Sequence, residues 1–534
     1  MLRWLHSSST WRTNLKSTHL KTSVAMFGAF AVAACNLILG GGYDVTDDPS
    51  RLDGASNDGN PANNPDGSVE QRDGACDFVP TTVSEFQRAC TGALCVPFGN
   101  KRLTGCDAGG SPATGYGCPG PTPAQPPVTN PPVDAGTPIA CDDPSVLRGM
   151  PPVYAISGDA MIPFAARIGQ ALSTLPAESA ARLFVTQGIS CLNVTTMLEE
   201  KTLLSVAPTA FYFEDNAGTL DQKTCSMTNL PNQRPDFSIS NVFATSCAAL
   251  PQGLPTNLSD QIGPVLVVEF GVPVTSGQTS ISAEAASLVF GIGGDAGVAP
   301  WQDPAAVHIR APQAGVVLTP APIINVPPTL WKGTVQRNGN ALFSALIAAN
   351  TAGGALADKS IGIIAATDLD PRRNVMKPLA FQDYGQTCGY YADSTASAFD
   401  KINVRDGHYP IWSSTHLITR VDGTGSPISP LAKRIINTMV GAEAIPGLDI
   451  IRLYADGRVV PNCAMRVKRQ ADSRDYTSFR PQNSCGCYFE LLATGGTSCT
   501  SCKSNTDCAN APGGATQCNL FGTPQVGYCE LPGG

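Results

Sequence analysis

The distribution of the nineteen cysteines is the feature that most constrains what this 534-residue chain can fold into. Most of them gather at two places, between Cys76 and Cys118 and between Cys485 and Cys529, where large apolar residues are few. Segments that cannot build a hydrophobic core need cross-links to hold a structure. Disulfides form in oxidising compartments, whereas a reducing cytosol would keep so many thiols free. The pattern predicts an extracytoplasmic protein with small disulfide-rich N- and C-terminal modules.

A zinc site is an alternative for the second cysteine cluster. Cys499 and Cys502 have the Cys-x-x-Cys spacing of zinc ligands. No second pair of this spacing and no histidine accompanies them in the cluster, so the sequence favours disulfides over a metal. We therefore expect no metal and no cofactor, and the sequence leaves the disulfide pairing open.

Residues 1–35 have the layout of an export signal. A basic region without acidic residues precedes an apolar stretch at 24–34, which is too short to span a bilayer as a helix. The stretch ends in Val-Ala-Ala before Cys35, a pattern that resembles the lipobox of bacterial lipoproteins. This resemblance implies cleavage before Cys35 and acylation of its thiol, which leaves an even number of cysteines for pairing. The alternative is an ordinary cleaved signal with an incidental cysteine.

Composition divides the rest of the chain into four parts. Residues 36–75 are mostly Asp, Gly, Asn and Pro, and we expect a disordered tether. Residues 76–150 hold the first cysteines and a Pro-rich linker. Residues 151–470 alternate short apolar runs with helical periodicity, as is typical of an α/β domain. Residues 471–534 form the Cys-rich C-terminal module.

The net charge of −8 argues against a nucleic-acid partner. A protein that binds nucleic acid neutralises phosphates with clustered Lys and Arg side chains. No dense basic run occurs in this sequence.

Short apolar runs predict the strands of the central domain, at 153–156, 183–185, 264–268 and 361–364. Ser282 is a predicted N-cap for a helix that runs to Phe290 and stops at Gly291.

Three places in the central domain share a plan of strand, short polar turn and helix, at 156–161, 185–191 and 236–242. A helix start leaves backbone N–H groups unpaired and carries positive potential. Several starts that converge on one point would make a site for an oxyanion or a polar ligand. Taken singly, each such segment is more often an ordinary helix cap.

In their order along the chain, these segments resemble the periplasmic phosphate-binding proteins of ABC importers, which are type 2 periplasmic binding proteins. The similarity runs over residues 152–468 with weak identity. Segment 157–164 is similar to the family's opening turn and first helix, and 187–190 to its second ligand turn. Segment 236–241 matches a stretch that normally ends in Ser-Asp, and Arg310 stands where the ligand arginine would be. The resemblance implies two α/β lobes, a hinge and a ligand buried in the cleft.

The sequence departs from the ligand set of that family at three places. After Arg310, the family's Ser-Gly-Thr reads Ala-Gly-Val at 314–316, which removes two hydroxyl donors. Asn241 replaces the family's carboxylate, and Asp159 replaces its hydroxyl residue at the first turn. A site built for hydrogen bonds loses selectivity steeply when donors are removed. We therefore expect that free phosphate is not the ligand.

The predicted ligand-binding residues are Asp159, Ala160, Ser190, Asn241, Arg310 and Gly315. We hypothesise that Asp159 caps its own helix and pairs with Arg310 across the cleft, in the place that an anion would take. The pocket would then accept a neutral or zwitterionic solute, or nothing.

The leading interpretation is a lipid-anchored extracytoplasmic solute-binding protein with an altered ligand pocket. Its expected partners are a small polar or anionic solute, an ABC permease, and a membrane reached through the lipid on Cys35. The expected location is the cell envelope, in the periplasm or at the outer-membrane surface. The alternative is a surface interaction lipoprotein that keeps the scaffold but no longer serves transport.

Catalysis is not expected. Asp406, His408 and His416 lie near two serines in sequence, but a Ser–His–Asp site requires hydrogen-bond reach between the groups. The chain has no Gly-x-Ser-x-Gly elbow, no His-Glu-x-x-His and no Walker loop. We expect the polar run 400–408 to be an exposed loop or a contact between lobes.

Overall fold

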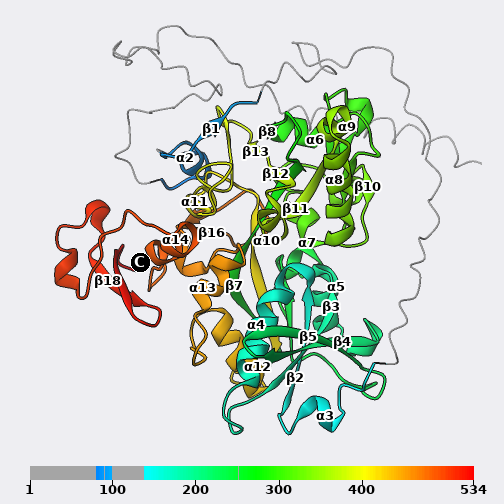
Figure 1. The fold of residues 1–534 in the computed structure, drawn as a ribbon, viewed down its shortest axis with the longest axis vertical. Helices are drawn as coiled ribbons and strands as arrows, with labels where there is room; N and C mark the ends of the chain where they lie inside the picture. The colour runs from blue at the N-terminus through cyan, green and yellow to red at the C-terminus, as the bar shows by residue number, and fades with distance from the viewer. Residues whose placement is uncertain (1–79, 90, 99–137, 251, 534) are drawn as a thin grey trace, which may run out of the picture. The chain divides into compact units, whose positions relative to one another are not determined.

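The computed structural model describes residues 80–89, 91–98, 138–250 and 252–533 (Figure 1). The predicted signal peptide, the predicted lipidation site at Cys35, the predicted tether and most of the first cysteine cluster lie outside these residues. Within the described ranges, no helix is both long enough and apolar enough to cross a membrane.

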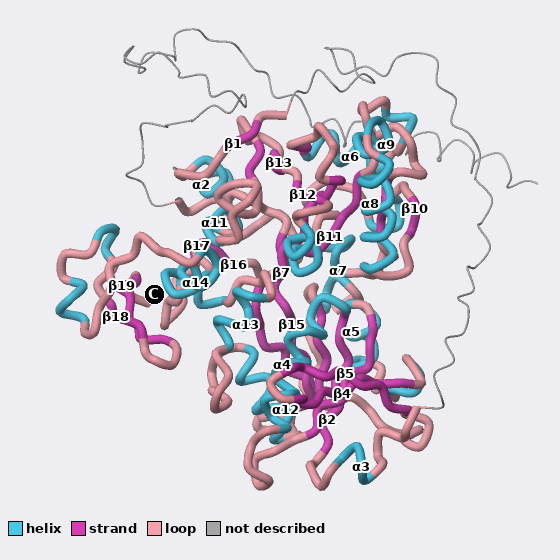
Figure 2. Tube along the Cα trace, in the orientation of Figure 1, coloured by secondary structure: helices cyan, strands magenta, loops and turns pink. Residues whose placement is uncertain are grey.

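The long strand β7 (Leu258–Pro273) belongs to both lobes of the protein. Its first part pairs with β15, and its last part pairs with β11 and β12. The resulting sheet has the order β10-β9-β11-β7-β15-β6-β2-β3-β4-β5. In Figure 2, β7 and β15 run side by side through the middle of the described fold. The predicted two-lobed α/β fold is therefore confirmed.

The first lobe contains one end of this sheet and the second lobe contains the other end. The strands of the first lobe are β2 (Pro152–Gly158), β3 (Arg182–Gly188), β4 (Thr209–Asn216), β5 (Thr219–Ser226), β6 (Phe237–Ser240) and β15 (Trp412–Arg420). Those of the second lobe are β9 (Val307–Ile309), β10 (Thr334–Val335), β11 (Ile361–Ala365) and β12 (Met376–Pro378). A separate four-stranded sheet joins β1 (Cys95–Val96), β14 (Gly389–Tyr390), β13 (Ala380–Gln382) and β8 (Ser280–Ser282).

Helices cover both faces of the first-lobe sheet because its strands are apolar on both faces. On β2, Val153 and Ala155 share a core with α4 and α12, whereas Tyr154 and Ile156 face a second core. The helix α5 packs on β2 and β6. The helices of this lobe are α3 (Pro144–Leu147), α4 (Ile162–Ser173), α5 (Ser190–Leu198), α12 (Pro430–Met439) and α13 (Ile450–Asp456).

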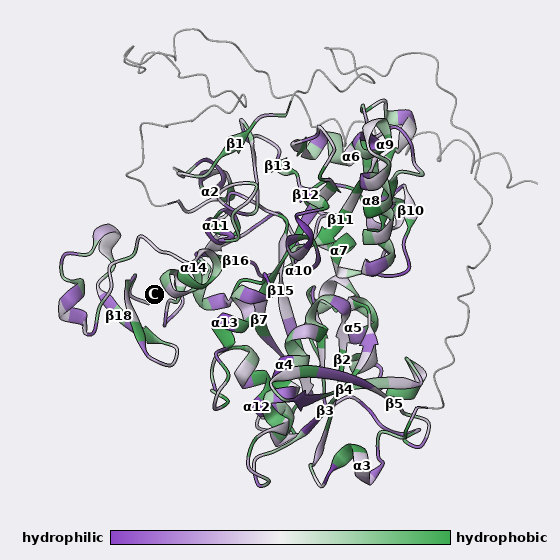
Figure 3. Ribbon diagram, viewed as in Figure 1, coloured by the Kyte–Doolittle hydropathy of each residue, from purple (hydrophilic) through white to green (hydrophobic). Residues whose placement is uncertain are grey.

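The second lobe has its own hydrophobic core, built around Phe270, Phe290, Trp301 and Phe381. Hydrophobic residues fill the second half of β7, whereas the edge strand β5 is largely hydrophilic (Figure 3). The helices of this lobe are α6 (Ala283–Gly291), α7 (Gly315–Leu318), α8 (Gly339–Ala352), α9 (Gly354–Lys359) and α10 (Ala366–Leu369). The remaining helices are α2 (Val83–Arg88), α11 (Ile402–Asp406) and α14 (Gly486–Thr494).

The apolar runs identified four strands correctly, since they became β2, β3, β7 and β11. The predicted N-cap Ser282 is confirmed because its Oγ accepts a hydrogen bond from Ala285 N at 3.1 Å. The predicted stop at Gly291 is one residue early, since α6 includes Gly291 and Ile292 is its C-cap.

Seven disulfides join cysteines of the described ranges. The zinc alternative is wrong because Cys499 and Cys502 lie in disulfides with two different partners. Cys95 from the first cluster bonds to Cys388, which holds β1 beside β14. The pairs are Cys95–Cys388, Cys141–Cys225, Cys191–Cys247, Cys463–Cys485, Cys487–Cys499, Cys502–Cys518 and Cys508–Cys529.

Two short antiparallel hairpins complete the C-terminal part. Strands β16 (Val467–Lys468) and β17 (Thr477–Ser478) form one, and β18 (Gln517–Phe521) and β19 (Val526–Glu530) form the other. The helix α14 packs against α13 and β19, and Phe489 of α14 belongs to the second-lobe core. The cystine-rich module therefore lies directly against the central part of the chain.

Candidate ligand-binding site

The structure brings all six predicted ligand-binding residues to the wall of one small cavity. The cavity has a volume of about 50 Å³. This is well below the 150 Å³ or so of an engineered cavity that holds benzene, so the space suits a ligand of only a few heavy atoms. Its lining consists of Gly158, Asp159, Ala160, Gly188, Ile189, Ser190, Asn241, Arg310, Ala314, Gly315, Val316, Ala365 and Asp368.

The first-lobe wall forms where three parallel strands end side by side. Strand β2 lies between β3 and β6, with Gly158 opposite Gly188. The carboxyl ends of parallel strands share one edge of a sheet, which is where ligands of open α/β sheets bind. The turns after β2, β3 and β6 therefore carry Asp159, Ser190 and Asn241 to the same place.

Only one of the three predicted helix starts on this wall is a regular α-helix start. Ser190 is the first residue of α5, whereas Asp159 opens a single 3₁₀ turn before α4. Asn241 lies in a bend that leads to another 3₁₀ turn at Ala244–Ser246, so the helix predicted after 236–242 is wrong. The sequence there fails to continue as a helix because Ser240 Oγ bonds locally to Val242 O and Val242 N.

The second-lobe wall has a similar construction. Arg310 follows β9, Ala365 is the last residue of β11, and Asp368 follows β11, which pairs in parallel with β9. The start of α7 adds Ala314 and Gly315.

The two walls touch at Gly315. A Cβ atom at this position would lie 2.7 Å from Ser190 Oγ and 3.1 Å from Asn241 Cβ, so only glycine fits without a shift. Nearby, Cys191 N donates to Gln313 O at 3.4 Å. These contacts describe a closed arrangement of the two lobes.

The Asp159–Arg310 pair crosses the cavity, as the sequence hypothesis expected. Arg310 Nη1 lies 3.5 Å from Asp159 Oδ2. The capping part of the hypothesis is wrong, because the Asp159 side chain makes no cap hydrogen bond and instead accepts from Gln187 Nε2. Gly158 is the N-cap of this 3₁₀ turn, and Asp159 is the first residue after it. The Asp159 carboxylate is therefore not used as a cap and can reach across the cleft.

Two buried polar atoms of the lining have no hydrogen-bond partner among the described residues. They are Arg310 Nε, a donor, and Asn241 Oδ1, an acceptor. The two residues are 9% and 6% exposed. A buried polar group without a partner is unfavourable, so both atoms favour a polar molecule in the cavity.

Sequence reasoning missed Asp368. Burial raises the pKa of this carboxyl to about 6, with Arg372 opposing the shift and Asp159 adding to it. The signal was present, because Asp368 follows the predicted strand 361–364 in the same plan of strand, turn and helix that marked the other segments. The cavity therefore carries two carboxylates against one guanidinium.

The lining has the donors and acceptors to bind and orient a small polar molecule. Among the lining residues there is no histidine, cysteine or lysine to activate a nucleophile. The two histidines considered for a Ser–His–Asp site bond to other groups. His416 Nδ1 bonds to Asp260 Oδ2 at 2.7 Å, and His408 Nε2 bonds to Ala89 O at 2.8 Å. Asp406 forms an ion pair with Arg466 instead of either histidine.

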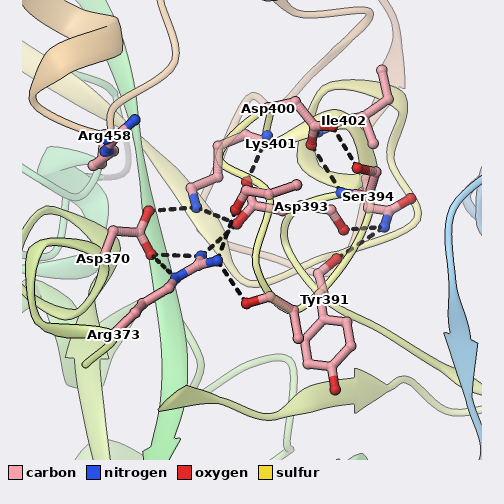
Figure 4. Close-up of polar contacts among 12 residues, drawn as sticks. Asp370, Arg373, Tyr391, Asp393, Ser394, Asp400, Lys401, Ile402 and Arg458 are labelled. Carbon is pink, nitrogen blue, oxygen red and sulfur yellow. Dashed lines mark hydrogen bonds and ion pairs between the residues drawn. The ribbon is translucent and has the colours of Figure 1, made fainter. Parts of the chain in front are cut away.

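A second polar cluster lies in the interior, and none of its charged residues lines the cavity (Figure 4). Lys401 Nζ lies 2.7 Å from Asp370 Oδ2 and 2.8 Å from Asp393 Oδ2, and Arg373 contacts the same two carboxylates. Burial alone would lower the pKa of Lys401, but these carboxylates raise it above its ordinary value. The cluster is therefore a buried ion-pair network in which each of the two cations meets both carboxylates.

The exposed loop expected at 400–408 is wrong because of this network. Lys401, Asn403, Arg405 and His408 are each at most 1% exposed. Their charged and polar groups are buried because partners from elsewhere in the chain meet them, such as Asp370 for Lys401 and Ala464 O for Arg405.

No protein-family model matches the chain, and no curated protein matches it. Solved structures match at low similarity. An ABC-type phosphate transport receptor from Vibrio cholerae is 10% identical, with 57% of this chain and 99% of that chain covered and a TM-score of 0.35. A phosphate-binding protein from Stenotrophomonas maltophilia is 12% identical, with 64% and 98% covered and a TM-score of 0.34. The reduced OxyR regulatory domain from Pseudomonas aeruginosa is 8% identical, with 55% and 98% covered and a TM-score of 0.29.

Proposed function

We propose that this protein is a solute-binding protein of the cell envelope, attached to a membrane by a lipid on Cys35, with a pocket altered away from free phosphate. The observation that carries the proposal is the cavity itself. Five segments spread between Gly158 and Asp368 meet there, and two polar atoms of their side chains are buried without a hydrogen-bond partner among the described residues.

The charges of the lining support a ligand other than a free dianion. Asp159 occupies one side of Arg310, and Asp368 adds a second carboxylate, so an incoming dianion would be repelled. A small zwitterionic or neutral polar solute suits this lining, because Arg310 and Ser190 donate while Asp159, Asp368 and Asn241 Oδ1 accept.

The extracytoplasmic part of the proposal rests on the cysteines. Seven disulfides among the described residues fit an oxidising compartment, where such bonds persist. The lipid anchor rests on the lipobox-like sequence that ends at Cys35. An ABC permease would be the partner that receives the solute.

A thermal-shift panel of inorganic oxyanions, small amino acids and sugars tests this proposal. A ligand at 100 times its Kd stabilises the folded protein by about 2.7 kcal/mol, which raises Tm by several degrees. We expect one chemical class to raise Tm, and Arg310→Gln to abolish the rise. Arg480→Gln is the matched control, because Arg480 is exposed and does not line the cavity, and this variant should keep the rise in Tm.

Native mass spectrometry of protein purified without added ligand complements the panel, since a trapped solute would add its mass to the intact protein. If no compound shifts Tm and no extra mass is found, transport is contradicted. The chain would then be better described as a surface interaction lipoprotein that retains the scaffold.

A further inference from the structure

The loop of the β16–β17 hairpin forms hydrogen bonds with segments that continue from both walls of the candidate pocket, at Phe243 and Ile323. This loop, residues 469–476, has no regular secondary structure and is held by side-chain contacts. We call it the 469–476 strap. We propose that its residues Asp472 and Arg474 are positioning residues that hold the two pocket walls in the closed arrangement, an inference that rests on the proposed binding function.

Asp472 binds the first-lobe wall. Its Oδ2 accepts hydrogen bonds from Phe243 N at 2.8 Å and from Ser246 Oγ at 2.6 Å. Its Oδ1 accepts from Ser413 Oγ of β15 at 2.7 Å. Phe243 lies two residues after the pocket residue Asn241, so one carboxylate fixes the bend that presents Asn241 to the cavity.

Arg474 binds the second-lobe side. Its Nη1 donates to Ile323 O at 3.0 Å, and its Nη2 donates to Asp383 Oδ1 at 2.7 Å. Ile323 lies in the turn that follows α7, and α7 begins at Gly315, the glycine next to Ser190 and Asn241. Hydrogen bonds that involve charged groups are among the stronger ones in proteins.

Both ends of the strap are fixed, so its middle is held in place. Arg469 donates to Pro410 O at 2.6 Å and its guanidinium lies 4.1 Å from the centre of the Trp412 ring. At the other end, Tyr476 packs on Phe86 with ring centres 5.8 Å apart. A loop anchored in this way can transmit restraint from one lobe to the other, since Asp472 and Arg474 are only two residues apart.

The bound walls are the ones that must separate for a solute to enter or leave. Domain closure around a ligand is a general mechanism of two-lobed binding proteins, and its equilibrium is shifted by any contact made in one state only. Asp472 and Arg474 therefore favour the closed state and slow opening of the cavity.

Hydrogen exchange of the full chain without ligand tests the strap. Asp472→Asn keeps the side-chain shape but gives Phe243 N a weaker acceptor, so exchange should become about tenfold faster in peptides that cover 241–246 and 314–323. Arg474→Lys, which loses one of the two donated bonds, should affect the same two peptides. Asp475→Asn, at an exposed neighbouring position, is the control and should leave both unchanged.

A purely structural role predicts a different pattern. If exchange rises only within 469–476, or rises equally in β2 and α4, the strap does not position the pocket walls. Because no ligand is added, this result is independent of the thermal-shift panel. A panel without hits would count against solute binding, whereas unchanged exchange in both walls would count against the strap.

Discussion

Glu269 is buried in β7 beside the ion-pair network, and neither of its carboxylate oxygens has a hydrogen-bond partner among the described residues. Burial raises the pKa of Glu269 from 4.5 to about 8, and Lys401 opposes this shift only in part. The side chain is therefore mostly protonated at neutral pH. This protonation leaves Asp370 and Asp393 to balance Lys401 and Arg373.

Replacement of Glu269 by glutamine should make stability less dependent on pH. Between pH 4.5 and about 8 the folded wild type binds a proton that the unfolded chain releases, so its stability falls as pH rises through this window. Glu269→Gln does not lose stability in this way. Its free energy of unfolding relative to wild type should therefore increase by up to about 1.4 kcal/mol per pH unit. Urea unfolding from pH 5 to pH 8 measures the difference.

Glu178→Gln is the matched control for this experiment, because Glu178 is exposed. Its difference from wild type should stay constant over the same pH range. A constant difference for Glu269→Gln as well would mean that Glu269 is ionised in the folded protein.

At the scale of elements, the Cys191–Cys247 disulfide fixes the segments that carry two pocket residues. It joins α5, which begins at Ser190, to the 3₁₀ turn that follows Asn241. The bonded cysteines are 56 positions apart in sequence. In the chain-entropy description, a cross-link over a loop of this length stabilises the folded protein by about 4 kcal/mol, because it lowers the entropy of the unfolded chain.

The double variant Cys191→Ser with Cys247→Ser should therefore unfold at a lower urea concentration, with a loss of about 2–4 kcal/mol. Removal of Cys487–Cys499, which spans 12 positions, is the matched control and should cost less. An unchanged urea midpoint for the first variant would contradict the account of how α5 is held.

The elements that sequence predicted correctly are those whose signal is local. The apolar runs of β2, β3 and β11 and the hydroxyl of Ser282 each act within a few residues. The error at 400–408 occurred where distant partners decide, whereas the helix wrongly predicted after 236–242 failed because of local bonds of Ser240. Lys401 is buried because Asp370, 31 positions away, meets it, and no local pattern in 400–408 reveals that.

The contrast between local and distant signals also explains which residues of the candidate site could be predicted. The three turns, together with the resemblance to phosphate-binding proteins that supplied Arg310, predicted Asp159, Ser190, Asn241 and Arg310 as a group, and the structure places them around one cavity. Asp368 could have been found from the plan of strand, polar turn and helix, applied to the strand that precedes it. The strap could not, because Asp472 and Phe243 are 229 positions apart and neither lies in a recognisable motif.

At the scale of the whole molecule, the account depends on how the two lobes meet. Strand β7 runs through both lobes, and the cavity forms where Asp159 of one lobe faces Arg310 of the other. The close approach at Gly315 and the strap contacts belong to the closed state. We propose that in that state Asp159 takes the place next to Arg310 where an anion would bind.

Calorimetric titration of inorganic phosphate at about neutral pH tests this claim most directly. Removal of the Asp159 carboxylate frees Arg310 and removes a repulsive charge, so Asp159→Ser should gain phosphate binding relative to wild type. Asp295→Ser, at an exposed aspartate of the second lobe, is the control and should behave like wild type. The account predicts no micromolar phosphate binding by wild type and measurable binding by Asp159→Ser. Micromolar binding by wild type would contradict it.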